Sequence, residues 1–303
     1  MAKGKRKLRF FIAVIIFILV FIYWDNNSLQ VSRYTLYYDD LPDEFDNYRI
    51  VQISDMHGKT FGKNNSYLAY KVKKLEPDIL VATGDMMSSN KDDGKAFLDF
   101  LDQFGNECPV YMSMGNHEQI ARWLNGIEET NILYENFISE VKKRGVIVLD
   151  NESLLLSNKE ADSNDHPVYL SGLTIELYHY SRRDLNPGDE SLYLKTSYIS
   201  GVLGEPKGFT IILAHNPAYF REYAEWGADL VLSGHVHGGV IQVPFKGGLL
   251  SPERVFFPEF DAGLFEEGGS KMIVNRGLGY SQINFRLFNR PEISMITLKK
   301  GNG

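Results

Sequence analysis

Cysteine is almost absent from this chain of 303 residues, because Cys108 is the only one. A single cysteine excludes an intrachain disulfide, and it also excludes a metal site built from several thiolates. The scarcity does not fix the cellular compartment, since many exported bacterial proteins also lack disulfides.

Positive charge is also in short supply. Lys and Arg number 32 against 39 Asp and Glu, which gives a formal net charge of -7. General nucleic-acid binding depends on basic surface, so no nucleic-acid partner is expected. Repeats of the solenoid type are absent as well. The length and the 44% hydrophobic content suit one large globular domain or two small ones.

The one long apolar run stands at the N-terminus. Five cations lie within residues 3–9, and Phe10–Trp24 is then uncharged and almost wholly apolar. Fifteen helical residues rise about 22 Å, which is less than the roughly 30 Å hydrocarbon core of a bilayer. Leu8, a snorkelling Arg9 and the interfacial pair Tyr23-Trp24 would make up the difference. The segment therefore predicts a transmembrane helix.

This helix is expected to stay attached to the chain. A cleaved signal peptide and an uncleaved signal-anchor both fit the apolar run, but no small-residue cleavage site follows Trp24 in Asp25–Gln30. We therefore favour a signal-anchor over residues 1–24 that crosses the cell membrane once, and the N-terminal segment contains no twin-arginine pair. The positive-inside rule then predicts that the rest of the chain lies on the extracytoplasmic side.

Five short apolar runs share one pattern, in which each ends in Asp, His or Asn, often beside glycine. They are Ile50–Gly58, Asp78–Asp85, Val110–Glu118, Thr210–Pro217 and Leu230–Gly239. Each predicts a buried strand with a polar turn at its carboxyl end, where α/β folds place their sites. One such run is an ordinary strand with a polar end, but five in order are hard to explain by packing alone.

Helical patterns alternate with these strands and indicate an α/β core. The segments with apolar residues at helical spacing or with helix-terminal signals are Ser66–Leu75, Asp92–Phe104, Ile132–Arg144 and Pro217–Gly227. Further strands are expected over Leu29–Tyr38, Val146–Leu149, Leu154–Leu156, Val168–Leu170, Met272–Val274 and Ile293–Leu298, with loops at Leu41–Asp46 and at the disorder-prone Asn158–His166.

The last polar turn holds His235 and His237, two residues apart among glycines. This spacing could direct two imidazoles into one small volume, and neutral imidazole is the commonest metal ligand among side chains. By itself the pair fits a surface loop equally well. Its weight depends on the other side chains that converge on it.

Taken together, the polar turns resemble the sequence blocks of the calcineurin-like metallophosphoesterase superfamily, in family order. The blocks are Asp55-x-His57, Gly84-Asp85, Gly115-Asn116-His117-Glu118, His215 and Gly234-His235-x-His237. The resemblance runs from about Asn47 to Leu298. Gly238-Gly239, Val274–Gly279 and Arg290–Ile293 are similar to a membrane-associated bacterial branch of phosphodiesterases within it. Val240 and Thr174 depart from that branch, where Gln and Asp are usual, and are expected to affect substrate specificity more than metal binding.

The resemblance implies a fold and a ligand set. The fold is an α/β (α+β) metallophosphoesterase sandwich of two facing mixed β-sheets flanked by helices, with residues 25–46 as linker and first strand and 47–300 as catalytic domain. Two divalent cations would be held, with Asp85 as their bridge. By resemblance the ligands are Asp55, His57 and His237 at one site, and Asn116, His215 and His235 at the other. Oxygen and nitrogen ligands favour Mn²⁺, with Fe, Zn or Co as alternatives.

The implied chemistry is phosphohydrolysis. Two cations about 3.5–4 Å apart acidify a bridging water and clamp phosphate oxygens, so a metal-bridging hydroxide attacks the phosphorus. Relatives imply a phosphodiester or pyrophosphate in a phosphorylated small molecule or a lipid-linked, cell-envelope substrate. His117 and Asp85 are the expected catalytic residues. His117 would bind the phosphate or protonate the leaving group, because a histidine pKa lies near working pH. Glu118 is expected to orient a ligand or the loop.

Two alternative functions stay open at this point. A di-metal centre alone does not separate a diesterase from a phosphomonoesterase that acts on proteins or nucleotides. A non-catalytic envelope scaffold would have lost ligands or the proton donor, and none is visibly lost. The sequence gives no indication of the oligomeric state.

Two aromatic segments carry weaker signals. His179 lies in Tyr178–Tyr198, for which a solvated insertion is favoured over a phosphate-contacting loop. The stretch Pro252–Phe265 holds four phenylalanines, Phe256, Phe257, Phe260 and Phe265. Packing beneath a long loop is favoured for them over a lipid-facing lip.

Overall fold

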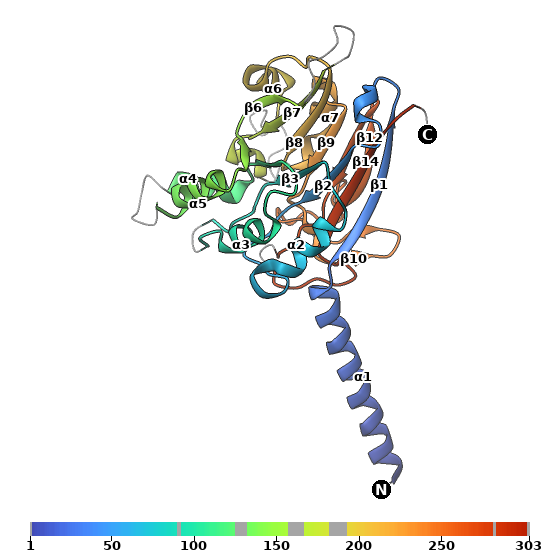
Figure 1. The fold of residues 1–303 in the computed structure, drawn as a ribbon. Coiled ribbons are helices and arrows are strands. Elements are labelled where there is room, and N and C mark those ends of the chain that lie inside the picture. The colour runs from blue at the N-terminus through green and yellow to red at the C-terminus, as the bar shows by residue number, and fades with distance from the viewer. Residues whose placement is uncertain are drawn as a thin grey trace.

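In a computed structural model of the protein, one long N-terminal helix projects from a body built of two β-sheets (Figure 1). The structure describes residues 2–89, 92–124, 132–156, 167–181, 193–280 and 283–301. Within them, α1 (Ala2–Asn27) precedes two six-stranded sheets that face each other and carry helices on their outer sides. The predicted sandwich with one N-terminal apolar helix is confirmed.

The first sheet places the start of the body and the first polar turn at one end. Its strands run in the order β1 (Gln30–Tyr38), β14 (Glu292–Lys300), β2 (Arg49–Ile53), β3 (Ile79–Thr83), β4 (Val110–Ser113) and β5 (Ile147–Leu149). β1 is parallel to β14, whereas β14 is antiparallel to β2. The amino end of β1, into which α1 leads, therefore lies at the same end of the sheet as the carboxyl ends of β2, β3 and β4.

The second sheet repeats this polarity. Its order is β12 (Gly263–Glu267), β13 (Ser270–Val274), β9 (Leu230–Ser233), β8 (Phe209–Ala214), β7 (Val168–Leu173) and β6 (Glu152–Leu155). The four central strands are parallel, and the two edge strands are antiparallel to their neighbours. Every residue of β3 and β8 is buried, which explains their continuous apolar runs.

Three apolar layers hold the body together. Ile50 and Val81 of the first sheet meet Ile211 and Leu232 of the second in the layer between the sheets. The outer face of the first sheet packs on α2 (Ser66–Lys73), α3 (Lys95–Phe104) and α5 (Ile132–Lys143). The outer face of the second sheet packs on α6 (Thr196–Leu203) and α7 (Phe220–Trp226).

Some local elements differ from the sequence prediction. α3 begins at Lys95 rather than Asp92, because the Asp92 carboxylate accepts the N–H groups of Ser88 and Gly94 and so holds a turn. The helices α4 (Asn116–Leu124) and α6 were not predicted, and Leu41–Asp46 contains a 3₁₀ turn. The remaining short elements are η1 (Asp43–Phe45), η2 (Lys63–Asn65), η4 (Leu177–Tyr180), η7 (Pro217–Tyr219), η8 (His237–Gly239), β10 (Gln242–Val243) and β11 (Gly247–Gly248).

The two aromatic segments also differ from expectation. Phe260 lies 5.8 Å from Phe220 and 5.1 Å from Phe265 between ring centroids, so packing is confirmed for this pair. The prediction of packing beneath the loop is wrong for Phe256 and Phe257, whose side chains are 68% and 45% exposed.

A solvated insertion is wrong for the stretch around His179. This histidine is buried because η4 folds against η7, where the Tyr219 hydroxyl donates to the His179 carbonyl at 2.9 Å. Residues 182–192 of the stretch Tyr178–Tyr198 and the predicted loop Asn158–His166 lie outside the described residues.

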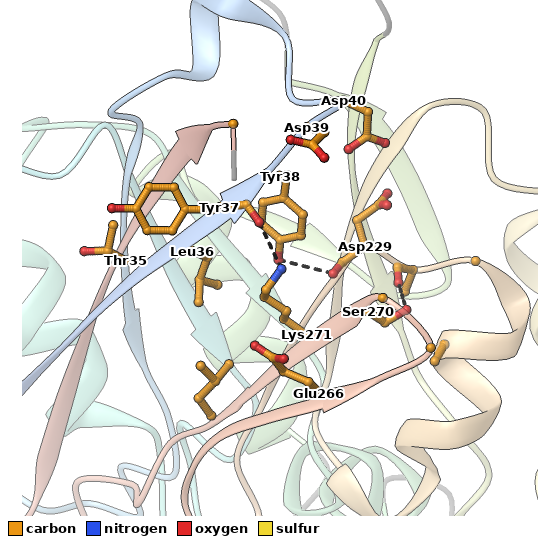
Figure 2. Close-up of a pocket in the computed structure, with 17 residues that line it drawn as sticks. Thr35, Leu36, Tyr37, Tyr38, Asp39, Asp40, Asp229, Glu266, Ser270 and Lys271 are labelled. Carbon is orange, nitrogen blue, oxygen red and sulfur yellow. Dashed lines mark hydrogen bonds between the residues drawn. The ribbon is translucent and has the colours of Figure 1, made fainter. Parts of the chain in front are cut away.

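A cavity of about 700 Å³ lies at the far end of the body, beside the carboxyl end of β1 (Figure 2). Lys271 crosses it and donates to the Tyr37 carbonyl at 2.9 Å, with its ammonium 4.1 Å from the Tyr38 ring. Burial raises the pKa of the neighbouring Asp229 to about 6. Among the described residues, the groups of three side chains able to hold a metal all lie elsewhere.

Candidate metal centre

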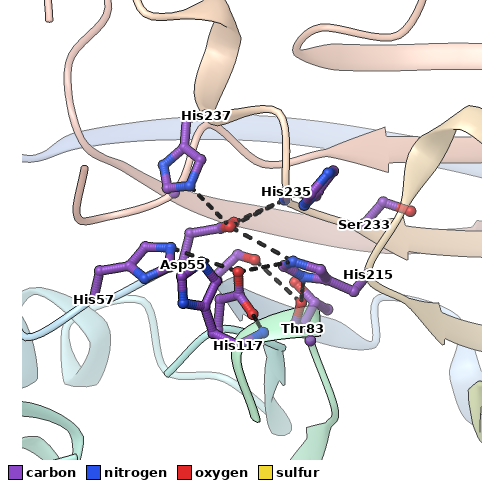
Figure 3. A network of polar contacts seen from close by, with 12 residues as sticks. Asp55, His57, Thr83, His117, His215, Ser233, His235 and His237 are labelled. Atoms are coloured by element: carbon purple, nitrogen blue, oxygen red, sulfur yellow. Dashed lines mark hydrogen bonds and ion pairs between the residues drawn. The ribbon is translucent and has the colours of Figure 1, made fainter. Parts of the chain in front are cut away.

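The predicted ligands converge where the two sheets present the carboxyl ends of their parallel strands to each other (Figure 3). Asp55 and His57 follow β2, and Asp85 follows β3. Asn116 and His117 begin α4 after β4. From the second sheet, His215 follows β8, and His235 and His237 follow β9. Five separate turns thus contribute to one buried volume.

The distances between these side chains suit shared cations. His215 Nε2 lies 3.2 Å from Asp85 Oδ2 and 3.8 Å from Asp55 Oδ1. His237 Nε2 lies 3.3 Å from Asp55 Oδ1, and His57 Nε2 lies 3.6 Å from Asp85 Oδ2. Three groups have their ligand atoms within 4.8 Å of one another, namely Asp55/His57/His237, His57/Asp85/His117 and Asp85/His215/His235. Asp85 belongs to two of them, as a bridging carboxylate would.

Three of the predicted ligand atoms are buried without a hydrogen bond. They are His57 Nε2, His215 Nε2 and Asn116 Oδ1. A buried polar atom without a partner costs about 1–3 kcal/mol, so three in one place call for a common partner. Cations between them would satisfy all three, and the residues present therefore fit a metal centre.

The outward nitrogens of three histidines are held by groups outside the centre. His215 Nδ1 lies 2.6 Å from the Thr83 carbonyl, and His57 Nδ1 lies 3.2 Å from Ser88 Oγ. His235 Nε2 contacts the Glu253 carboxylate. Each partner orients the ring and leaves the other nitrogen available, which is the arrangement typical of metal-binding histidines.

The protonation preferences of the site also fit cations. Burial lowers the pKa of His57 to about 3 and also lowers that of His237, so both are neutral, the form that binds metals. His215 behaves in the opposite way. Burial would lower its pKa, but Asp85 and Asp55 together raise it to about 10. Positive charge is therefore strongly favoured between these two carboxylates.

Backbone strain also occurs in these turns. The φ angles are 49° at Asp55, 44° at His57, 57° at Asp85, 69° at His235 and 52° at His237. A left-handed conformation at a residue other than glycine costs about 1–3 kcal/mol, and it persists only where its surroundings enforce it. These turns aim the side chains inward from the strand ends.

Two glycines make room for the carboxylates. A Cβ at Gly115 would lie 2.1 Å from Asp85 Oδ1, and a Cβ at Gly234 would lie 2.3 Å from Asp55 Oδ2. Real Cβ atoms do not approach other atoms so closely, so a larger residue at either position would displace the carboxylate.

Glu118 fixes the loops around Asp85. Its carboxylate accepts the backbone N–H groups of Asp85 at 2.8 Å, Gly115 at 2.9 Å and Met87 at 3.1 Å. Burial raises the pKa of Glu118 to about 7, although these N–H groups oppose the shift. The backbone N–H of His117 donates to Asp85 Oδ1 at 2.8 Å. Glu118 thus has the loop-orienting position that the sequence predicted.

One ring nitrogen of His117 is fixed by the backbone. Its Nδ1 accepts the backbone N–H of Ser89 at 3.1 Å, so a neutral His117 ring carries its hydrogen on Nε2. The residue is half-buried, and its ring lies 4.6 Å from that of His57. The N–H is therefore held at the edge of the centre.

Two residues near the centre were missed from the sequence. Burial would raise the pKa of Glu253, but His235 outweighs it and the pKa falls to about 2, so this carboxylate is ionised. Arg286 is 1% exposed and lies 3.4 Å from His237 Nδ1, while it donates to the carbonyls of Arg276 and Gly279. Both lie in irregular segments far along the chain from their histidines, where no local pattern marks them.

A cavity of about 330 Å³ adjoins the centre beside His235. Its walls include Glu253, Asn216 and Arg221, together with buried His179 and the packed ring of Phe260. The cavity therefore offers polar and apolar walls to a ligand that reaches the metal-binding side chains.

Several known proteins are similar to this chain over most of its length. The chain is 27% identical over 288 residues to the metallophosphoesterase YkuE of Bacillus subtilis (strain 168), covering 92% of this chain and 89% of that protein. It is 28% identical over 309 residues to the UDP-2,3-diacylglucosamine pyrophosphatase LpxG of Chlamydia trachomatis serovar D, covering 90% and 91%. It is 27% identical over 271 residues to a transmembrane protein with metallophosphoesterase domain from Bos taurus, covering 86% and 54%.

The family match covers the converging residues themselves. The profile described as calcineurin-like phosphoesterase matches residues 48–239, which is more than half of the chain and spans every turn from Asp55 to His237. The chain belongs to the calcineurin-like phosphoesterase family and is a metallophosphoesterase, a hydrolase that acts on phosphoester bonds.

Proposed function

We propose that this protein is a di-metal phosphohydrolase that cleaves a phosphodiester or pyrophosphate bond in a lipid-linked or cell-envelope substrate. Asp55, His57 and His237 would hold one cation, and Asn116, His215 and His235 the other, with Asp85 shared between them. The observation that carries this proposal is the set of three ligand atoms buried without hydrogen bonds beside one shared carboxylate.

When bound, the cations supply an acidified water and neutralise charge on the phosphate oxygens. The protein contributes position and a proton. The backbone N–H of His117 donates to the Asp85 carboxylate, and Glu118 accepts the backbone N–H of Asp85, so together they fix the orientation of Asp85. The Nε2–H of neutral His117 would donate a hydrogen bond to a phosphate oxygen. To protonate the leaving oxygen, His117 would first take up a proton as the imidazolium and would return to the neutral ring afterwards. Asn116 adds an oxygen ligand without adding negative charge, which keeps the site attractive to an anionic substrate.

Similarity to LpxG supports a lipid-like pyrophosphate, because that protein is named for its action on UDP-2,3-diacylglucosamine. The cavity beside His235 gives room for groups attached to the phosphate. A phosphomonoesterase is the alternative, and relative rates on a diester and a monoester separate the two.

We also propose that α1 anchors the enzyme. Lys5–Asn27 is long and apolar enough to cross a membrane. Residues 1–24 would be an uncleaved signal-anchor whose cations stay in the cytoplasm, and the catalytic domain, residues 47–300, would lie on the extracytoplasmic side of the cell membrane.

Metal removal and replacement test the proposed reaction. The full chain, purified in detergent, should contain about two metal ions per molecule, one for each predicted cation position. It should hydrolyse bis(p-nitrophenyl) phosphate faster than p-nitrophenyl phosphate. Chelation should abolish turnover, and Mn²⁺ should restore it. A chain that holds no metal and hydrolyses neither ester would contradict the proposal.

Glu253 provides a sharper test of the ligand assignment. Glu253→Gln removes the charge that holds His235 Nε2, so metal affinity should fall roughly 10–100-fold, as measured by competition with a chelator. Glu259→Gln is the matched control, since Glu259 lies in the same loop but pairs with Arg221 at the surface, where both side chains are 60% exposed. Equal affinities in the two variants would show that Glu253 does not position a ligand.

A further inference from the structure

The metal centre lies at the end of the body from which α1 leaves. The Asn26 side chain of α1 donates to the Arg286 carbonyl at 2.9 Å and accepts the Arg286 N–H at 2.8 Å. The guanidinium of Arg286 lies 3.4 Å from His237. Buried Arg286 therefore contacts both the end of α1 and the predicted ligand His237.

A group of exposed apolar side chains surrounds this end, and we call it the rim. Its members are Phe245 at 108% exposure, Phe256 at 68%, Phe288 at 55%, Ile283 at 47% and Phe257 at 45%. Soluble monomers rarely gather so many large apolar groups on one surface unless it binds something.

The rim is continuous with α1 and with the metal-binding turn. Phe288 lies 5.6 Å from Phe21 of α1 between ring centroids. The carbonyl of its neighbour Leu287 accepts the N–H of Gln242, at the base of the β10–β11 ribbon that carries Phe245 at its tip. Figure 1 shows β10 at the end of the body from which α1 projects. A membrane crossed by α1 would therefore meet the rim next.

Charge at the rim also suits a membrane surface. Lys246 follows Phe245 and lies 5.7 Å from the Phe257 ring, and Arg254 is exposed two residues before Phe256. The chain as a whole has a net charge of -7, so cations beside apolar tips are a local departure from its average. Such pairs favour the interface of an anionic bilayer.

Another cavity, separate from the one beside His235, lies between the rim and the metal-binding turn. It measures about 220 Å³ and is lined by Val236, Val240, Leu250, Pro252, Ile283 and two polar residues. Val236 stands between His235 and His237, so the metal-binding turn itself supplies one wall of the cavity. Its apolar walls suit a hydrocarbon chain rather than a sugar or a nucleotide.

We propose that the rim is a membrane-contact surface, through which the metal centre takes phosphate groups of lipids in the bilayer that α1 crosses. The lipid phosphate would reach the ligands while an acyl chain occupies the cavity beside Val236. The contact itself stands independently, whereas the access of lipid phosphate rests on the proposed hydrolytic function.

Depth-dependent quenching tests the contact without any need for activity. In the full chain with Cys108→Ser, a single cysteine is introduced as Phe245→Cys or Phe256→Cys and labelled with a polarity-sensitive fluorophore. Tyr37→Cys is the matched control, because Tyr37 is an exposed aromatic residue at the far end of the body. The proteins are reconstituted into phosphatidylethanolamine–phosphatidylglycerol vesicles with or without a spin-labelled lipid.

Quenching at the two rim positions should exceed that at the control by roughly threefold or more, as expected for side chains inserted in the interface. Equal quenching at all three positions would overturn the contact. A second copy of the chain could cover the rim instead. In that case the signal would follow the protein-to-lipid ratio and ignore the quencher, which would also overturn the proposal.

Lipid access is tested with the Mn²⁺-loaded full chain on phosphatidylglycerol vesicles and on bis(p-nitrophenyl) phosphate. The ratio of the lipid rate to the soluble rate should fall roughly tenfold in Phe245→Ser/Phe256→Ser, but not in the far-end control Tyr37→Ser/Leu264→Ser. Hydrolysis of the soluble diester with none of the lipid would overturn lipid access while leaving the hydrolytic function intact. Absence of both activities would contradict the hydrolytic function, and the quenching result would still decide the contact.

Discussion

Asp85→Asn should abolish metal loading and lower kcat/KM for bis(p-nitrophenyl) phosphate by about a thousandfold or more, because a metal centre supplies several kcal/mol of transition-state stabilisation. Asp85 shares one ligand group with His57 and another with His215 and His235, so it contacts both halves of the site. An amide keeps the shape of the carboxylate but removes its charge. It also turns a donor NH₂ group toward His57 or His215, or toward the His117 N–H.

The matched control for Asp85→Asn is Asp229→Asn. Asp229 is also a largely buried carboxylate, but it lies beside the far cavity, and an amide oxygen can still accept the Thr210 N–H. This variant should keep two metals and nearly the parental rate. Thermal unfolding of the metal-free proteins shows whether both variants fold. An Asp85→Asn protein that keeps two metals and full turnover would refute the bridging assignment.

The strands that carry the centre could be predicted because local sequence determines them. β3 and β8 are buried on both faces, so their runs of apolar residues are unbroken and end abruptly at Asp85 and His215. The order of these polar ends matched a family pattern, which supplied the sandwich and the ligand set. The glycines beside these turns were part of the same family pattern, although the reason for Gly115 and Gly234 is tertiary: a Cβ there would strike the carboxylate of Asp85 or Asp55, which follows another strand.

Two supporting side chains, Glu253 and Arg286, could not be predicted, since tertiary contacts alone select them. Glu253 reaches His235 from a loop, and Arg286 reaches His237 from a segment 49 residues farther along the chain. Neither has a repeating pattern around it. Burial of the Arg286 guanidinium is possible only because several backbone carbonyls turn toward it, and sequence spacing does not reveal that arrangement.

The stretch Pro252–Phe265 also shows that sequence alone does not reveal tertiary contacts. Phe256 and Phe260 lie four residues apart in one segment, yet the first is exposed and the second packs on α7. Composition cannot separate them, because both roles need an apolar ring. The separation comes from the loop's contact with the β10–β11 ribbon, where Phe257 N–H donates to the Leu249 carbonyl.

His117→Ala should lower kcat by roughly 10²–10⁴-fold while leaving two metals bound, because the variant loses a positioned proton donor. The loss should be largest for a diester with a poor leaving group and smaller for bis(p-nitrophenyl) phosphate, whose leaving group needs little protonation. Ser89→Ala is the matched control. It keeps the backbone N–H that His117 Nδ1 accepts, so its rates should stay near the parental values.

Metal content distinguishes the proton-donor role of His117 from a ligand role. His117 shares a group with His57 and Asp85 whose ligand atoms lie within 4.8 Å, so a cation could in principle recruit its ring. If His117→Ala lost a metal, or if its rate loss were the same for good and poor leaving groups, His117 would be a ligand rather than the acid. The bond from Ser89 holds Nδ1 as an acceptor and keeps the hydrogen of the neutral ring on Nε2, so neither nitrogen is set up as a ligand. Protonation of the leaving group requires the imidazolium form, in which Nδ1 carries a hydrogen and gives up the Ser89 bond.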